Sequence, residues 1–187
     1  MTAHRQHADL AARHTAWILL ARLLTASAAP LQWLQRQAER TPYFDIHGPD
    51  GTLYMRRWWL LPKWCLRFDP KCGALMPKLW MPFSIRLHHI VRPDADRHLH
   101  DHPFNFRTIV LAGGYMEQTE PDGPVRPILP GDTYRSPARR FHRIAIVTGA
   151  GAWSLFIMGR RVNDWGFLVD GHKVPWQQYL AERRPQP

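Results

Sequence analysis

The sequence predicts an all-β protein, an antiparallel sandwich or barrel, with two helices in front of it. From residue 83 onward, short alternating runs of apolar residues follow one another, each bounded by Gly or Pro and without a helical segment between them. Many short strands at close spacing are typical of antiparallel β architectures. The first 40 residues differ, because their apolar side chains recur at helical spacing.

The N-terminal segment predicts helices over residues 8–28 and 31–40, separated at Pro30. The apolar run AWILLARLLTASA in the first of them also resembles part of a signal peptide, since it follows a basic start and ends in small residues. Arg22 interrupts the run, which is too short to span a bilayer. We therefore interpret it as an amphipathic helix, and we expect a cytoplasmic protein without a membrane partner.

The rest of the chain predicts a hairpin followed by a series of strands. IHGPDGTLYM is typical of a hairpin with its turn at GPDG. The proline-rich segment 121–132 is expected to be a rigid connector. The chain then divides into a helical extension (1–41), a barrel (42–178) and a frayed tail (179–187). The strands expected after the hairpin are residues 83–91, 98–111, 114–120, 133–136, 141–147 and 152–159.

Composition limits the classes of function. The 187 residues are 45% hydrophobic, which suits one packed domain and excludes wholesale disorder. The formal net charge of +10 suits an anionic partner, but Arg doublets on strands point to opposite faces, so no single basic stripe is visible. Nucleic acid is therefore an open but not a favoured partner. Cys65 and Cys72 lack metal-binding spacing and are expected to be reduced thiols, with a disulfide between them as the alternative.

Histidines are concentrated in RHLHDHPFNF, where His98, His100 and His102 occupy alternate positions. On a strand these side chains share one face at steps of roughly 7 Å. Two imidazoles at i and i+2 can therefore converge on one ion, whereas a third lies too far away, and we expect His98 to be outside the site. Imidazole suits Fe, Ni, Cu and Zn. Another strand must then supply a ligand, and His142, five residues after Pro137, is the candidate.

This arrangement resembles the two-motif signature of the cupin superfamily. The first cupin motif is HxH, then Glu after three or four residues, and the second is PxGxxH. HDH at residues 100–102 matches the first motif, and Pro137 with His142 matches the second, although Arg replaces its Gly. Phe106 or Arg107 stands where the Glu is expected. Longer segments, among them LYMRRWWLLP and RLHHIVRPDADRHLHDHPF, resemble a group of small cupin-like proteins of phages and bacteria.

The resemblance implies a double-stranded β-helix, the jelly-roll barrel of cupins. It also implies one divalent transition metal bound by His100, His102 and His142, as in the three-histidine site of thiol dioxygenases. Fe(II) is the metal expected first, with Zn, Ni or Mn as alternatives. The implied function is an Fe(II)-dependent dioxygenase acting on a small polar or anionic substrate.

The alternatives are a non-enzymatic module that binds a ligand, a protein or nucleic acid, and a metal-dependent sugar isomerase or epimerase. Because cupins often pair through sheet edges, the resemblance also suggests a homodimer.

Three further residues are candidates for substrate binding. Arg107 is expected near the metal as a cationic anchor for a carboxylate or phosphate. His89 lies on the more apolar face of its strand and is expected to point inward, with His88 outward. A buried, neutral His89 bonded to a backbone carbonyl is the commoner interpretation, and a role around the metal or substrate is the alternative. Glu117 on a neighbouring strand is the candidate for the missing carboxylate, whereas Asp101 should point away from the metal and pair with an arginine.

Overall fold

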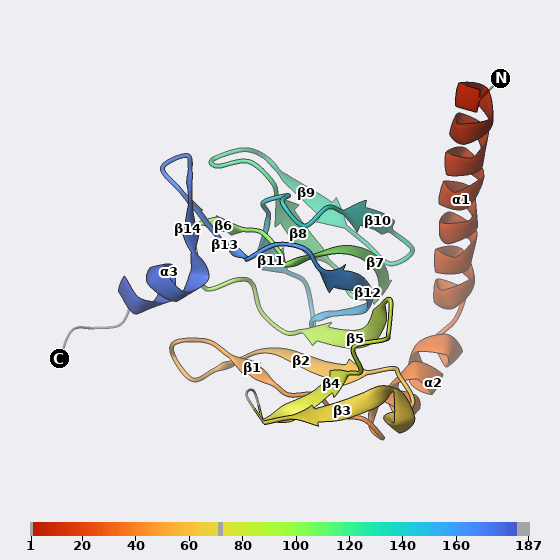
Figure 1. Cartoon of the computed structure of the whole chain (residues 1–187), viewed down its shortest axis with the longest axis horizontal. Coiled ribbons are helices and arrows are strands. Elements are labelled where there is room, and N and C mark those ends of the chain that lie inside the picture. The colour runs from red at the N-terminus through yellow and green to blue at the C-terminus, as the bar shows by residue number, and fades with distance from the viewer. Residues whose placement is uncertain (1, 71–72, 183–187) are drawn as a thin grey trace.

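Antiparallel strands fill the middle of the chain, and helices stand at both ends (Figure 1). The computed structural model describes residues 2–70 and 73–182, with side chains from His14 onward. In these ranges the helices are α1 (Thr2–Thr25), α2 (Ala29–Ala38), η1 (Lys63–Cys65, a 3-10 turn) and α3 (Trp176–Glu182). The strands are β1 (Ile46–His47), β2 (Leu53–Trp59), β3 (Leu66–Asp69), β4 (Ala74–Pro77), β5 (Ser84–Ile90), β6 (Leu99–His100), β7 (Phe104–Ala112), β8 (Tyr115–Gln118), β9 (Val125–Ile128), β10 (Thr133–Ser136), β11 (Arg143–Val147), β12 (Ala152–Arg161), β13 (Gly166–Val169) and β14 (His172–Pro175).

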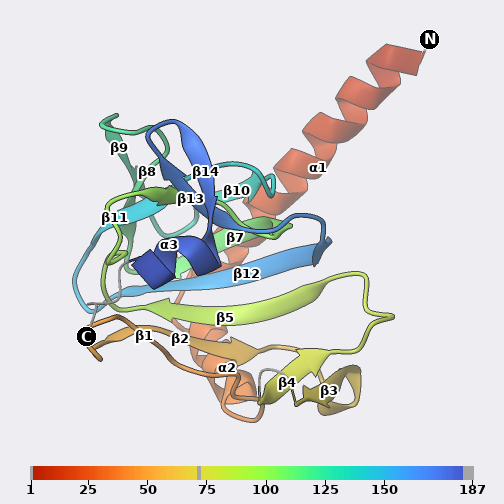
Figure 2. The same cartoon turned by 60° about the vertical axis from the view of Figure 1, so that its left-hand side comes forward.

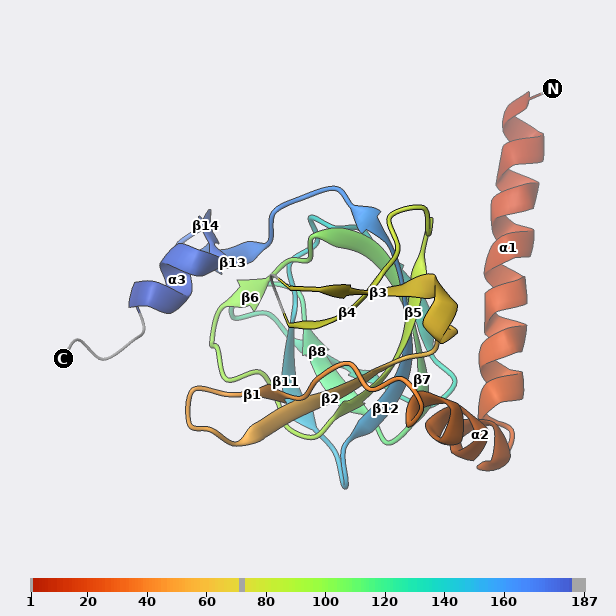
Figure 3. The same cartoon turned by 60° about the horizontal axis from the view of Figure 1, so that its bottom comes forward.

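The strands form a barrel with two walls (Figure 3). One wall is a six-stranded sheet in the order β1-β2-β5-β12-β7-β10. The other contains two three-stranded sheets, β11-β8-β9 and β14-β13-β6, connected by a bridge between His100 and His142. Every strand pair is antiparallel. The predicted all-β class with two N-terminal helices is confirmed.

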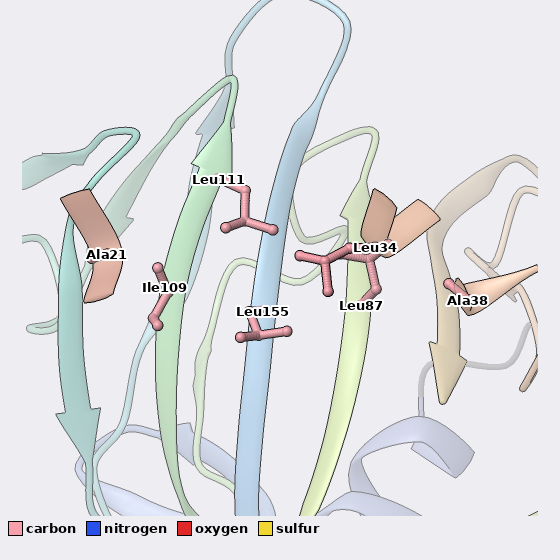
Figure 4. Packing of buried hydrophobic residues seen from close by; sticks show 7 residues of the cluster. All are labelled: Ala21, Leu34, Ala38, Leu87, Ile109, Leu111 and Leu155. Carbon is pink, nitrogen blue, oxygen red and sulfur yellow. The ribbon is translucent and has the colours of Figure 1, made fainter. Parts of the chain in front are cut away.

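The two N-terminal helices cover the outer face of the six-stranded sheet. Leu87, Ile109 and Leu155 are buried on this face and pack with Ala21 of α1 and Leu34 of α2 (Figure 4). The N-terminal half of α1 extends away from the barrel (Figures 1 and 2). Because successive strand residues alternate faces, Leu87, Ile109 and Leu155 point outward to the helices, and the residues between them along each strand line the interior.

Apolar side chains fill one end of the barrel. The hairpin of β3 and β4 lies across this end (Figure 3), and the indole Nε1 of Trp59 donates to the carbonyl oxygen of Leu75 at 2.7 Å. Trp59 is fully buried with Phe106, Phe156 and Met158 in the same cluster. The histidines lie on the wall that is made of the two three-stranded sheets.

The structure differs from the expected segments at several points. The strand predicted over 98–111 is broken at Pro103 into β6 and β7. Segment 121–132 contains β9, so its interpretation as a mere connector is wrong; β9 is an edge strand, where Pro127 costs no ladder hydrogen bond. Helix α3 extends through Glu182, so the predicted frayed tail is wrong for residues 179–182, and the remaining tail lies outside the described residues.

Other expectations concern the membrane and the cysteines. In the described ranges no single helix is both long and apolar enough to cross a membrane; α1 from His14 and α2 reach that composition only as a pair, bent by 90°. Cys65 is buried. Cys72 lies outside the described residues, so the choice between thiols and a disulfide stays a prediction.

Candidate metal centre

Three histidines converge on the second wall of the barrel. His100 ends β6, His102 follows two residues later, and His142 directly precedes β11. The backbones of His100 and His142 exchange two hydrogen bonds of 2.8 and 2.9 Å, which places the two residues directly opposite each other. One ring nitrogen of each of the three residues lies within 4.8 Å of the other two.

The geometry of these rings fits a transition metal. The Nε2 atoms of His102 and His142 lie 2.8 Å apart. Imidazole nitrogens bind such metals at about 2.0–2.1 Å, so two ligands of one ion lie about 3 Å from each other. Burial lowers the pKa of His100, and it lowers the pKa of His102 well below its ordinary value. Both rings are therefore neutral at neutral pH, which is the form that binds metals.

Glu117 lies behind His142. The Nδ1–H of His142 donates to Oε1 of Glu117 at 2.8 Å, and the carboxylate also accepts from Tyr134 at 2.9 Å and from Nε of Arg126 at 2.8 Å. Burial alone would raise the pKa of Glu117, but the hydrogen bond from His142 and those from Arg126 and Tyr134 lower it to about 2. An ionised Glu117 fixes the proton of His142 on Nδ1 and leaves Nε2 free to face the other two rings.

Asp94 occupies the corresponding place behind His100. Its Oδ2 lies 3.8 Å from Nδ1 of His100 and accepts the backbone N–H of Ile144 at 2.7 Å. The other oxygen accepts the hydroxyl of Tyr54. Carboxylates behind ligating histidines are a recurrent feature of metal sites, because they orient the ring and raise its basicity. Glu117 makes such a hydrogen bond to His142, whereas Asp94 lies within ion-pair distance of His100 but beyond hydrogen-bond distance.

His98 and Asp101 of the histidine segment lie outside the cluster, as expected. Nδ1 of His98 lies 2.8 Å from the hydroxyl of Tyr179 on α3. Asp101 is buried and points away from the cluster; it accepts the backbone N–H of Gly166 at 2.8 Å. Its cationic partner is Lys173, not an arginine. Asp101 thereby fixes the β13–β14 hairpin against the segment that carries the ligands.

The prediction that Arg107 lies near the metal is wrong. Its guanidinium group lies over the ring of Trp17 of α1, 4.7 Å from the ring centre, and donates to Oγ1 of Thr133 at 3.2 Å. Alternation along β7 turns Phe106 inward, where its ring centre lies 4.8 Å from that of His102, and turns Arg107 outward.

The predicted orientations of His88 and His89 are also wrong. His89 lies on the outer face, stacked on Trp153 with ring centres 4.1 Å apart, and its Nε2 lies 3.0 Å from the carbonyl oxygen of Ala150. The contact with a backbone carbonyl, expected in the commoner interpretation of His89, is present, but the ring is half-buried and not fully buried as that interpretation assumed. His88 points inward and stacks on Phe156. The apolar face of β5 is the outer one because the helices cover it.

Sequence reasoning also missed two interior arginines. Arg57 of β2 and Arg86 of β5 belong to the inner face of the large sheet, on which Arg57 is paired with His88. The segment RLHHIV contained a signal, because alternation places Arg86 and His88 together on one face of the strand and Leu87 on the other. The sequence pattern gave no sign that helices cover the apolar face of this strand, so the apolar face was predicted to be the inner one.

The fold and the cluster together define a class of protein: a small antiparallel barrel that carries three converging histidines on one wall. No family model matches the sequence, and no curated protein matches it. Solved structures do resemble it. The DMSP lyase DddQ from Ruegeria pomeroyi aligns with a TM-score of 0.52 at 16% identity, over 84% of this chain and 76% of that one. The polyketide cyclase RemF from Streptomyces resistomycificus aligns with a TM-score of 0.51 at 15% identity, over 79% and 91%.

A third structure, Rru_A2000 from Rhodospirillum rubrum, is described as a cupin-2 domain. It aligns with a TM-score of 0.48 at 10% identity, over 77% of this chain and 82% of that one. The protein has the barrel fold of DddQ and RemF, the jelly roll that the sequence resemblance to cupins implies, with a cluster of three histidines suited to a divalent metal. At these identities the likeness concerns the fold alone.

Proposed function

We propose that the protein is an Fe(II)-dependent dioxygenase that acts on a small polar or anionic substrate. The observation that carries the proposal is the ligand set: His100, His102 and His142 converge, while the carboxylates of Glu117 and Asp94 lie behind the rings. Three protein ligands leave coordination positions open. Bound Fe(II) would supply the redox chemistry that oxygen insertion needs.

Aromatic side chains surround His102 and give the centre an apolar wall. The ring centres of Phe104, Phe106 and Phe156 lie 5.9, 4.8 and 6.2 Å from that of His102. Such a wall excludes water and lowers the local dielectric constant, which strengthens electrostatic contacts to a bound substrate and protects reactive species from side reactions. These residues would shape the site without taking part in proton transfer.

The proton-transfer groups around the cluster argue against a sugar isomerase or epimerase. Those reactions need a general base close to a substrate carbon. Both carboxylates are already engaged, Glu117 with His142 and Asp94 with Tyr54 and the backbone of Ile144. An oxidation by O2 places no such demand on the protein, which favours the dioxygenase over the isomerase.

Oxygen consumption tests the proposal. Protein reconstituted anaerobically with Fe(II), and in parallel with Zn, Ni or Mn, is mixed with a panel of small organic acids, phosphate esters and neutral sugars. The proposal expects substrate-dependent O2 uptake with Fe(II) only, and its loss in the His100→Ala/His142→Ala double variant. Uptake that is equal in the double variant, or turnover of a sugar without O2, would contradict it.

A further inference from the structure

Two arginines inside the barrel, Arg57 and Arg86, have no acidic partner among the residues that the structure describes. Arg86 is 7% exposed, and its Nε, the Nε of Arg57 and the Nε2 of His88 are buried without a hydrogen-bond partner in the part of the chain that the structure describes. Among the same residues neither guanidinium group forms an ion pair with a carboxylate. Buried polar groups in proteins are nearly always hydrogen-bonded, so three unpartnered nitrogens side by side require an explanation.

Burial of these charges is costly. It lowers the pKa of Arg86 to about 9, with a further contribution from Arg57, and it lowers the pKa of Arg57 to about 10. Aromatic rings compensate in part. The Arg86 guanidinium lies 4.3 Å from the ring centre of Trp59, that of Arg57 lies 4.0 Å from Phe44, and both lie over Tyr43 at 4.7 and 4.6 Å. These rings hold the guanidinium groups in place but offer their N–H donors no good acceptor.

The unpartnered nitrogens and the metal ligands share one inner surface. His88 stacks on Phe156 with ring centres 4.7 Å apart, and the ring centre of Phe156 lies 6.2 Å from that of His102. Phe156 is also the residue opposite Arg86 in the pairing of β12 with β5. The ring of Phe156 therefore lies between His88 and the histidine cluster, with Arg86 beside it and Arg57 next to His88 on the neighbouring strand.

We propose that Arg57, Arg86 and His88 form an anion-binding subsite that holds the carboxylate or phosphate group of the substrate while its other end reaches the three histidines. The planar guanidinium group matches both kinds of anion, since it can donate two parallel hydrogen bonds. The substrate class is then a small organic acid or a phosphate monoester. That the bound anion is a substrate rests on the proposed function. The binding of the anion itself does not depend on the metal.

Thermal unfolding of the full chain in the presence of anions tests the subsite. Phosphate and acetate are titrated separately at constant ionic strength, with chloride as the balancing ion, into protein as purified and into protein freed of metal by chelation and dialysis. A ligand that binds only the folded state raises Tm in a saturable manner. Which anion binds more tightly distinguishes a phosphate ester from a carboxylic acid.

Arg86→Met and Arg57→Gln are the test variants, and Arg107→Gln is the matched control, because Arg107 lies on the opposite face of the same sheet. Loss of a charge-assisted hydrogen bond should weaken anion binding about tenfold or more. Arg86→Met should nevertheless fold at least as stably as the wild type without anions, since it removes a buried unpaired charge. Arg86→Lys, which keeps the charge but loses the two parallel bonds, should bind with intermediate affinity.

The outcomes divide clearly. Saturable stabilisation of the metal-free wild type, lost in Arg86→Met and Arg57→Gln and kept in Arg107→Gln, would support the subsite. The proposal is overturned if the metal-free wild type shows no saturable response, or if all variants respond alike. A response that disappears with the metal would place the anion on the metal and also overturn it. Because the readout requires neither metal nor turnover, failure of the dioxygenase proposal alone would leave these results unchanged.

Discussion

His142 is held from behind by Glu117, and this contact determines which of its nitrogens is free. Glu117 is 1% exposed and ionised, and its oxygens accept from His142, Tyr134 and Arg126. A neutral amide at the same place would be a weaker acceptor, and it would no longer balance the charge of Arg126. The ligand ring would then lose both its orientation and part of its basicity.

Glu117→Gln should weaken metal binding by about 10–100-fold, the usual cost of losing a carboxylate behind a ligating histidine. Competition with a chelator of known affinity measures the effect. Glu120→Gln, which changes an exposed carboxylate on the same segment, is the control and should bind metal like the wild type. Equal metal affinity in the Glu117 and Glu120 variants would show that Glu117 does not support His142.

The same substitution should change stability in a pH-dependent way. The folded-state pKa of Glu117 is about 2, below its ordinary 4.5, so its contribution is fully present above pH 4.5 and is lost as the pH falls toward 2. The difference in unfolding free energy between wild type and Glu117→Gln should be on the order of 3 kcal/mol at pH 7 and should shrink at acid pH. Urea unfolding at several pH values measures it, and a difference that grows toward acid pH would contradict the assigned ionisation.

At the scale of elements, the N-terminal helices pack on one face of the six-stranded sheet, and the opposite face therefore becomes the interior of the barrel. Leu87, Ile109 and Leu155 point outward because Ala21 and Leu34 of the helices bury them (Figure 4). The six-stranded sheet therefore has apolar groups on its covered outer face and a mixed polar and aromatic interior. That arrangement leaves room on the inner wall for charged side chains next to the histidines.

Leu87→Ala tests this packing. Leu87 is 0% exposed, and truncation of a buried leucine costs about 2–5 kcal/mol. Leu23→Ala on the exposed side of α1, at 68% exposure, should change stability by no more than about 0.5 kcal/mol. Urea unfolding measures both variants, and a Leu87→Ala protein as stable as the Leu23→Ala protein would show that the helices do not bury this face.

Local spacing predicted the two N-terminal helices, the first hairpin and most strands after residue 83, but not β3, β4, β13, β14 or α3. HDH and a later histidine after a turn, through their resemblance to the two cupin motifs, predicted that His100, His102 and His142 converge, and the structure brings them together. Local spacing could not predict the side of the sheet to which Arg107 and His89 point, because this depends on which face the helices cover. Asp94, behind His100, gave no signal because its contacts with Tyr54 and Ile144 join distant parts of the chain.

At the scale of the whole molecule, the N-terminal helices and the barrel share one hydrophobic cluster. Ala21, Leu34 and Ala38 are buried together with residues of β5, β7 and β12, so the predicted boundary at residue 41 runs through a packed interface. The barrel without these helices would expose a contiguous apolar face, which is typical of surfaces that aggregate.

A fragment that begins at residue 40 should therefore aggregate or unfold without a cooperative transition. Size-exclusion chromatography and thermal unfolding of the fragment, beside the full chain, measure this. A fragment that remains monomeric and unfolds as cooperatively as the full chain would show that the barrel is stable by itself and that the helices are an accessory.

Metal content tests the central claim most directly. Elemental analysis of the purified full chain, after reconstitution and removal of loosely bound ions, is compared between wild type, the His100→Ala/His142→Ala double variant and His98→Ala as the matched control. The structure predicts about one divalent transition metal per chain in wild type and in His98→Ala, and none in the double variant. Equal metal content in wild type and the double variant would contradict the assignment of the three histidines as the metal centre.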